Sequence, residues 1–212
     1  MRGTTARGRR DGGWSPTRKM LAAIAVLGAA ASIAGLGTFA TFTSSTSASH
    51  TVSSGTVTIA LGATGAATNR LTVGASAIAP GDTIQRSVDL INSGSIDLAS
   101  VTLTTTATTS SLLDTDTSNG LQMVIDKCSN AWTEAGPPYT YSCSGSTSSV
   151  LTTRPVVGST LALSNLGSLT NGTTDHLRVT LTLPGTAGNT LQNQSSTISY
   201  AFTGTQRTAT NK

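Results

Sequence analysis

The residues that could do chemistry in this chain are few and lie far apart. The two histidines, His50 and His176, could act as bases or metal ligands, and Asp175 directly precedes the second. Neighbouring residues of a strand point to opposite faces, so Asp175 cannot orient His176 as a catalytic base. The chain has no His-Glu-x-x-His sequence, which would place two metal ligands and a base on one helix. We therefore predict no catalytic residue, no metal site and no cofactor.

The remaining polar residues do not match a ligand-binding motif. Asp114, Asp116 and Asn119 resemble the start of a calcium loop, but no glutamate follows at the required spacing, so we expect a solvated turn. The chain also lacks a phosphate-binding lysine motif, a Gly-x-Gly-x-x-Gly turn and a basic stripe with interleaved aromatic residues. Nucleic acid is therefore not expected as a partner.

The two cysteines, Cys128 and Cys143, are predicted to form a disulfide. No histidine lies near them in the sequence, which makes them a poor zinc site. In an oxidising compartment an even pair usually forms a bridge. Closing a loop of this length contributes about 3 kcal/mol to the free energy of unfolding in the chain-entropy treatment. Trp132 lies between the cysteines and is expected to pack over the bridge rather than stack on a sugar.

The first forty residues have the three parts of a secretory signal peptide. A basic leader precedes an uncharged apolar stretch from Met20 to Gly37, and small residues precede a cut between Ala40 and Thr41. The alternative is an uncleaved anchor, because the apolar stretch would span about 27 Å as a helix. We predict cleavage by a signal peptidase and a secreted product, with membrane contact only through the uncleaved segment.

The basic charge of the chain belongs to this leader. Six of the 13 cations precede residue 20, whereas beyond Ala40 seven cations face eight acidic residues. The net charge of +4 therefore does not indicate an acidic partner.

The elements that must carry these residues are strands, because the dominant hydrophobic period is two. The clearest run covers residues 176–183, where every odd position is aliphatic and Pro184-Gly185 ends the pattern. Further alternating runs cover 57–61, 83–92, 101–107 and 198–203. Arg86 is a polar exception on the apolar face of its run. A short helix is expected within 110–119, and 128–160 is expected to be the least regular part.

These strands, separated by Gly-, Pro- and Asn-rich turns, predict an all-β fold. We expect an antiparallel jelly-roll or Ig-like β-sandwich preceded by a cleaved signal peptide. The predicted parts are the signal peptide (1–40), an N-terminal segment (41–54), the sandwich domain (55–207) and a short tail (208–212).

The N-terminal segment has the composition of a strand that could be donated to another subunit. Residues 41–49 contain no charge, glycine or proline, and Phe42 is their only large apolar residue. An open sandwich edge exposes unpaired backbone groups that a neighbour's strand could satisfy. Such a head-to-tail contact does not close and would propagate into a filament. We expect Thr41, Phe42 and Thr43 to begin the donor strand.

Several segments occur together in a specific order over residues 37–206. They are Gly37–Phe42 at the cut, Ala79-Pro80-Gly81-Asp82-Thr83, Asn92–Leu98, and Ile198–Gln206. Each is ordinary alone, but their joint order resembles the TasA/camelysin family of exported bacterial proteins, whose signal peptides are of the kind cut by a SipW-type peptidase. The Cys128…Trp132…Cys143 stretch departs from the founding members and resembles an actinobacterial branch.

The resemblance implies a structural subunit of extracellular fibres, in a biofilm matrix or at the cell surface, whose partners are itself or related matrix subunits. Two alternatives stay open. A secreted or envelope-attached module for glycan or protein would be favoured by a surface aromatic cluster near Trp132, Tyr139 and Tyr141. A camelysin-like metallo-endopeptidase would require His50, His176 and carboxylates to converge.

Overall fold

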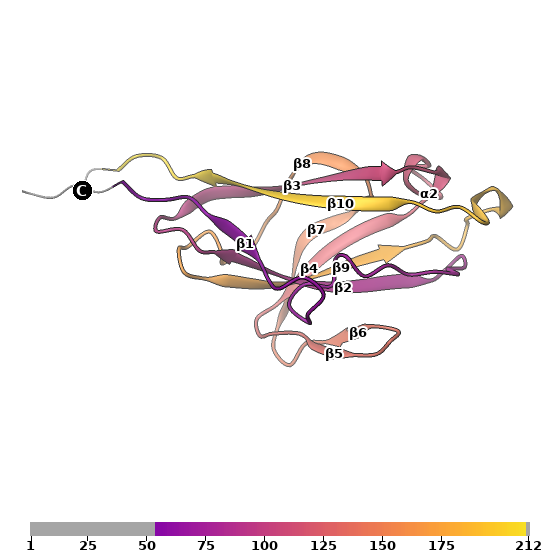
Figure 1. Cartoon of the computed structure of the whole chain (residues 1–212), viewed down its shortest axis with the longest axis horizontal. Coiled ribbons are helices and arrows are strands. Elements are labelled where there is room, and N and C mark those ends of the chain that lie inside the picture. The colour runs from indigo at the N-terminus through magenta and orange to yellow at the C-terminus, as the bar shows by residue number, and fades with distance from the viewer. Residues whose placement is uncertain (1–53, 211–212) are drawn as a thin grey trace, which may run out of the picture. The chain divides into compact units, whose positions relative to one another are not determined.

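A computed structural model describes residues 54–210 of the chain (Figure 1). The predicted signal peptide, its cut between Ala40 and Thr41, the predicted donor residues 41–43 and His50 lie outside the described residues. Within residues 54–210, no helix is long and apolar enough to cross a membrane.

The described chain is all-β and forms a sandwich of antiparallel sheets, as predicted (Figure 1). One sheet has the strand order β1 (Ile59–Leu61), β2 (Thr83–Asn92), β9 (Thr174–Thr182), β4 (Gln122–Cys128) and β7 (Thr147–Pro155). The other has the order β10 (Thr197–Gln206), β3 (Leu98–Thr109) and β8 (Gly158–Ala162). A hairpin of β5 (Thr133–Ala135) and β6 (Thr140–Ser142) lies outside the first sheet (Figure 1). The short helices are α2 (Leu112–Thr115) and η1 (Asn189–Leu191).

The core follows from the alternation of apolar and polar residues along the strands. In β9, Leu177 and Val179 are buried, whereas Arg178 and Thr180 between them are only partly buried. Residues of β2, β3 and β4 meet them in one cluster, of which the most buried include Val88, Leu90, Val101, Leu103, Met123 and Ile125. Burying each such side chain contributes roughly 1.5–3 kcal/mol, so this cluster dominates the stability of the sandwich.

The stretch 128–160 is more regular than expected. It contains β5, β6, β7 and the start of β8, whereas the sequence pattern predicted the least regular part of the chain. The strands were missed because they do not alternate. Val150 and Leu151 are adjacent and both buried, and the register between β4 and β7 shifts near Ile125. In β8, Thr160 has a φ of 50°, which interrupts the strand pattern before Leu161. The helix expected within 110–119 is present as α2.

Candidate functional site

His176 pairs with a carboxylate on the neighbouring strand, not with the residue that precedes it. The Nδ1 atom of His176 lies 2.7 Å from Oδ1 of Asp89, its direct partner in the register of β2 and β9. Asp175 is 3% exposed and instead accepts hydrogen bonds from the backbone amides of Gly167 and Ser168. Asp175 and His176 therefore do not form a base–orienter pair, as predicted. The His176–Asp89 pair could not be found by sequence, because it depends on the register of distant strands.

The described residues do not offer the ligands of a metal centre. Within 54–210, no group of three or more His, Cys, Asp or Glu side chains could hold a metal ion. His176 has Asp89 as its neighbour, and zinc takes three or four protein ligands. Asp116 accepts hydrogen bonds from the amides of Ser118 and Asn119, which makes the local turn expected there. A zinc ion therefore does not fit the donor set of this part of the chain.

The buried carboxylates are held in their charged form. Burial by itself would raise the pKa of Asp114, but hydrogen bonds from Ser196, from the Ser111 amide and from Ser110 outweigh it and lower the pKa. The same balance lowers the pKa of Asp175. A general acid or base works best with a pKa near the operating pH. These groups are therefore placed to hold loops together, not to transfer protons.

The loop between the cysteines is tied to the outer face of the five-stranded sheet. A disulfide joins Cys128 and Cys143, whose Cα atoms are 5.7 Å apart. The indole Nε1 of Trp132 donates to the backbone carbonyl of His176 at 2.9 Å, and the guanidinium of Arg178 lies 4.3 Å from the ring centroid. Trp132 is half-buried in this position, so part of its ring is already covered by the protein's own cation.

The two tyrosines near the hairpin are also engaged by the chain itself. Tyr141 is 7% exposed, and its hydroxyl donates to Glu134 at 2.8 Å. Tyr139 lies against two cations, with the guanidinium carbons of Arg70 and Arg86 at 4.9 and 5.2 Å from its ring centroid. The aromatic residues near the disulfide thus pack against charged groups of the same chain instead of forming a free stacking platform.

A large groove lies along one edge of the sandwich, with both apolar and polar lining residues, the polar ones including Arg86 and residues 192–196. It has a volume of about 1220 Å³. Ile84 of β2 and Leu181 of β9 line it from one sheet, and Ile198 and Tyr200 of β10 line it from the other. Residues 71–78 line it as well. Apolar side chains from both sheets can therefore contact a chain segment that enters here.

The rim of this groove includes a strand with a free edge. In the three-stranded sheet, β10 pairs with β3 alone, so its other edge has no strand partner within the described residues. The strand carries neither a charged residue nor a proline over Thr197–Gln206, the devices that usually protect an edge. An extended segment could therefore hydrogen bond to β10 while its side chains enter the groove.

Tyr200 is the aromatic residue of β10 that lines the groove, and it is half-buried. Burial raises the pKa of Tyr200 to about 12, although the nearby charge of Arg86 acts in the opposite direction. Because a buried phenolate is disfavoured, the hydroxyl of Tyr200 stays neutral at physiological pH.

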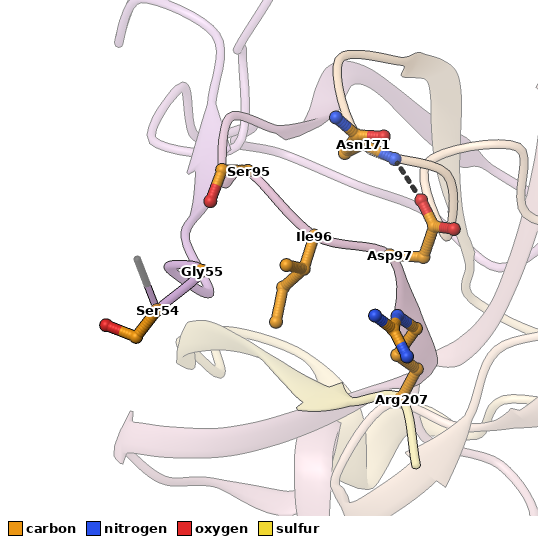
Figure 2. Close-up of a pocket in the computed structure, with 7 residues that line it drawn as sticks. All are labelled: Ser54, Gly55, Ser95, Ile96, Asp97, Asn171 and Arg207. Carbon is orange, nitrogen blue, oxygen red and sulfur yellow. Dashed lines mark hydrogen bonds between the residues drawn. The ribbon is translucent and has the colours of Figure 1, made fainter. Parts of the chain in front are cut away.

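A smaller hollow lies beyond the C-terminal ends of β2 and β10 (Figure 2). Its volume is about 510 Å³, and Gly55, Ile96, Asp97 and Arg207 are among the residues that line it. The carboxylate of Asp97 accepts a hydrogen bond from the backbone amide of Asn171 at 2.9 Å (Figure 2). Asp97 is the only acidic residue in its lining, so we assign the hollow no chemistry. The lining of this hollow shows that residues 54–55 lie near the C-terminal end of β10, whereas the groove is lined by the N-terminal residues of the same strand.

The sequence profile of the family described as camelysin metallo-endopeptidase matches residues 17–211. No curated protein matches the chain.

Proposed function

The chain belongs to the camelysin metallo-endopeptidase family, and we propose that it is an exported structural protein that forms fibres by strand donation. In this proposal the signal peptide is removed between Ala40 and Thr41, and the product is secreted to the extracellular matrix or the cell surface. The observation that carries the proposal is the groove, with apolar side chains from both sheets in its walls, beside the free edge of β10.

The groove suits the chemistry of residues 41–49. Their backbone can pair with the free edge of β10, because no proline removes a donor. Thr41 and Thr43 flank Phe42 and would point to the opposite face of the donated strand. Phe42 would enter the apolar wall near Ile198 and Tyr200. Burying this side chain fully would stabilise each joint by roughly 1.5–3 kcal/mol.

The ends of the domain are arranged as donation between subunits requires. The described chain begins at Ser54, which lines the hollow beyond the end of β10, while the groove is lined by the start of the same strand. The ten residues of β10 span roughly 33 Å. A segment that leaves one end of a subunit and enters the groove near the other end of the next subunit produces an open, head-to-tail chain.

The test compares the protein that begins at Thr41 with three variants. A form without residues 41–49 and the substitution Phe42→Asp should both abolish fibres seen by negative-stain microscopy. Ser47→Asp is the matched control, since it adds the same charge away from the anchor, and it should retain assembly. Equal polymerisation of the parent, the truncated form and Phe42→Asp would show that the N-terminal segment is not the joint. A parent that never polymerises would favour the binding-module alternative.

A zinc-dependent endopeptidase is the second candidate, and the description of the family is the observation that favours it. His50 lies outside the described residues, and within them His176 is bound to Asp89. Hydrolysis of a denatured protein substrate that is abolished by a chelator and by His176→Gln would support this candidate. Fibre formation that survives the same chelator would separate it from the structural function.

A further inference from the structure

Arg86 connects the edge of β2 to the segment that lines the groove. Its Nε donates to the backbone carbonyl of Val73 at 2.6 Å, its Nη2 to that of Gly74 at 2.7 Å, and its Nη1 to that of Gln85 at 2.6 Å. Hydrogen bonds from a guanidinium are stronger than those between neutral groups, and the planar fork fixes their geometry. This accounts for a charged residue on a face of β2 that otherwise holds Ile84 and Val88.

The segment bound by Arg86, residues 71–78, is here named the strap. Among the described residues, the backbone of 74–78 has no hydrogen bond other than the one from Arg86 to Gly74. Leu71 and Ile78 pack on the core from the two ends of the strap, while residues 74–77 are exposed. Ala77 has a φ of 54°, a conformation that is uncommon for residues other than glycine. The middle of the strap is therefore held mainly by one side chain.

The strap lies beside the part of the β2 edge that β1 does not cover. Along this edge, β1 covers Leu90–Asn92, and the carbonyls of Asp89 and Ser87 accept from the amides of Gly62 and Arg70. The next outward carbonyl, that of Gln85, is occupied by Arg86. The guanidinium thus occupies the next acceptor of this edge, and through Val73 and Gly74 it holds the strap along the groove that a strand paired with β10 would enter.

We propose that the strap is a closure of the groove, that Arg86 latches it, and that docking of a neighbouring subunit's strand requires this latch to open. The inference rests on the proposed function, because it concerns the regulation of the same groove. In this proposal Arg86 acts by holding the strap in position. The hairpin supports the latch, since Tyr139 contacts both Arg86 and Arg70, and Arg70 is paired with Glu134 at 2.7 Å.

The test uses the chain that begins at Thr41 and two independent measurements. Arg86→Leu removes the three hydrogen bonds, and Arg86→Lys keeps the charge but loses the fork. Arg207→Leu is the matched control, since the Arg207 side chain bonds only to Thr208 and Thr210 among the described residues. In Arg86→Leu, cleavage within 71–78 by a broad-specificity protease should accelerate by roughly tenfold or more. The lag before fibre growth should shorten, with Arg86→Lys between the parent and Arg86→Leu.

The outcomes distinguish the latch from the proposed function. Unchanged proteolysis within 71–78 in both Arg86 variants would overturn the latch. Faster proteolysis with a lag equal to that of Arg207→Leu would overturn its role in assembly, while the fibre function would stand. If none of the proteins polymerises, including the parent, the result refutes the fibre function and, with it, the role of the latch in assembly. Should Arg86→Leu not fold, as judged by circular dichroism, the same comparisons apply to Arg86→Lys.

Discussion

Replacing Asp175 by asparagine should destabilise the sandwich by an amount that can be derived from its contacts. The carboxylate is 3% exposed and accepts three hydrogen bonds, from the amide of Gly167 at 3.0 Å, the amide of Ser168 at 2.7 Å and Nζ of Lys127 at 2.9 Å. Asparagine has almost the same shape, but it removes the charge and turns one acceptor oxygen into a donor. One of the two backbone amides, the buried one of Ser168 or the more exposed one of Gly167, then loses its partner.

The expected loss is about 2–4 kcal/mol in the free energy of unfolding. A buried donor left without an acceptor costs about 1–3 kcal/mol. Breaking a fully buried ion pair costs about 3–5 kcal/mol, but Lys127 is 21% exposed and regains water, so its contribution is at the low end. The two losses overlap because they share one carboxylate.

Urea unfolding of the chain that begins at Thr41, followed at pH 7, measures this difference from the shift in midpoint at constant slope. Asp126→Asn is the matched control. Its carboxylate is 22% exposed in the pair with Arg178, so we expect a smaller loss of about 1 kcal/mol. A loss for Asp175→Asn below about 0.5 kcal/mol would contradict the reasoning, since an unpaired buried donor costs at least about 1 kcal/mol.

The pH dependence provides a second check on Asp175. Burial acts to raise its pKa, but the hydrogen bonds from Ser168, Lys127 and Gly167 outweigh it, so the folded pKa is lowered. A lowered folded pKa adds stability above the unfolded value, near 4, and this stability is lost as the pH falls through the folded pKa. The difference in the free energy of unfolding between the parent and Asp175→Asn should therefore become smaller as the pH is lowered below about 4. A difference in the free energy of unfolding that stays constant down to pH 2 would contradict the lowered pKa of Asp175.

Three further predictions concern the disulfide, the N-terminus and Asp114. Replacing both cysteines by alanine should lower the free energy of unfolding by about 3 kcal/mol and speed hydrogen exchange mainly over 129–146; two alkylated thiols in unreduced, denatured protein would exclude the bridge. Mass spectrometry of the exported protein should find Thr41 at the N-terminus, and a product that keeps Met20–Gly37 would show an anchor. Ser196→Ala removes a 2.5 Å hydrogen bond to Asp114. It should raise the pKa of Asp114 in a carbon NMR titration, and an unchanged pKa would contradict the role of Ser196.

The strands that alternate could be predicted from the sequence. The run 83–92 corresponds to β2, and the run 176–183 overlaps β9 except at its last residue. A period of two is a property of neighbouring residues, so it needs no knowledge of partners. β7 and β8 were missed because adjacent buried residues and a shifted register remove this local pattern.

The sequence by itself thus determined the all-β class, five of the ten strands of the described residues (β1, β2, β3, β9 and β10) and the position of Arg86 on an apolar face. Only the tertiary structure decided what these residues contact. The pairing of His176 with Asp89, the free edge of β10 and the binding of Arg86 to Val73 and Gly74 depend on strand order and register. The two pairings join segments that are distant in the chain or separated by a loop, and the free edge follows from the order of the strands in the sheet. Their geometry is set by the packing of the two sheets, which no local pattern encodes.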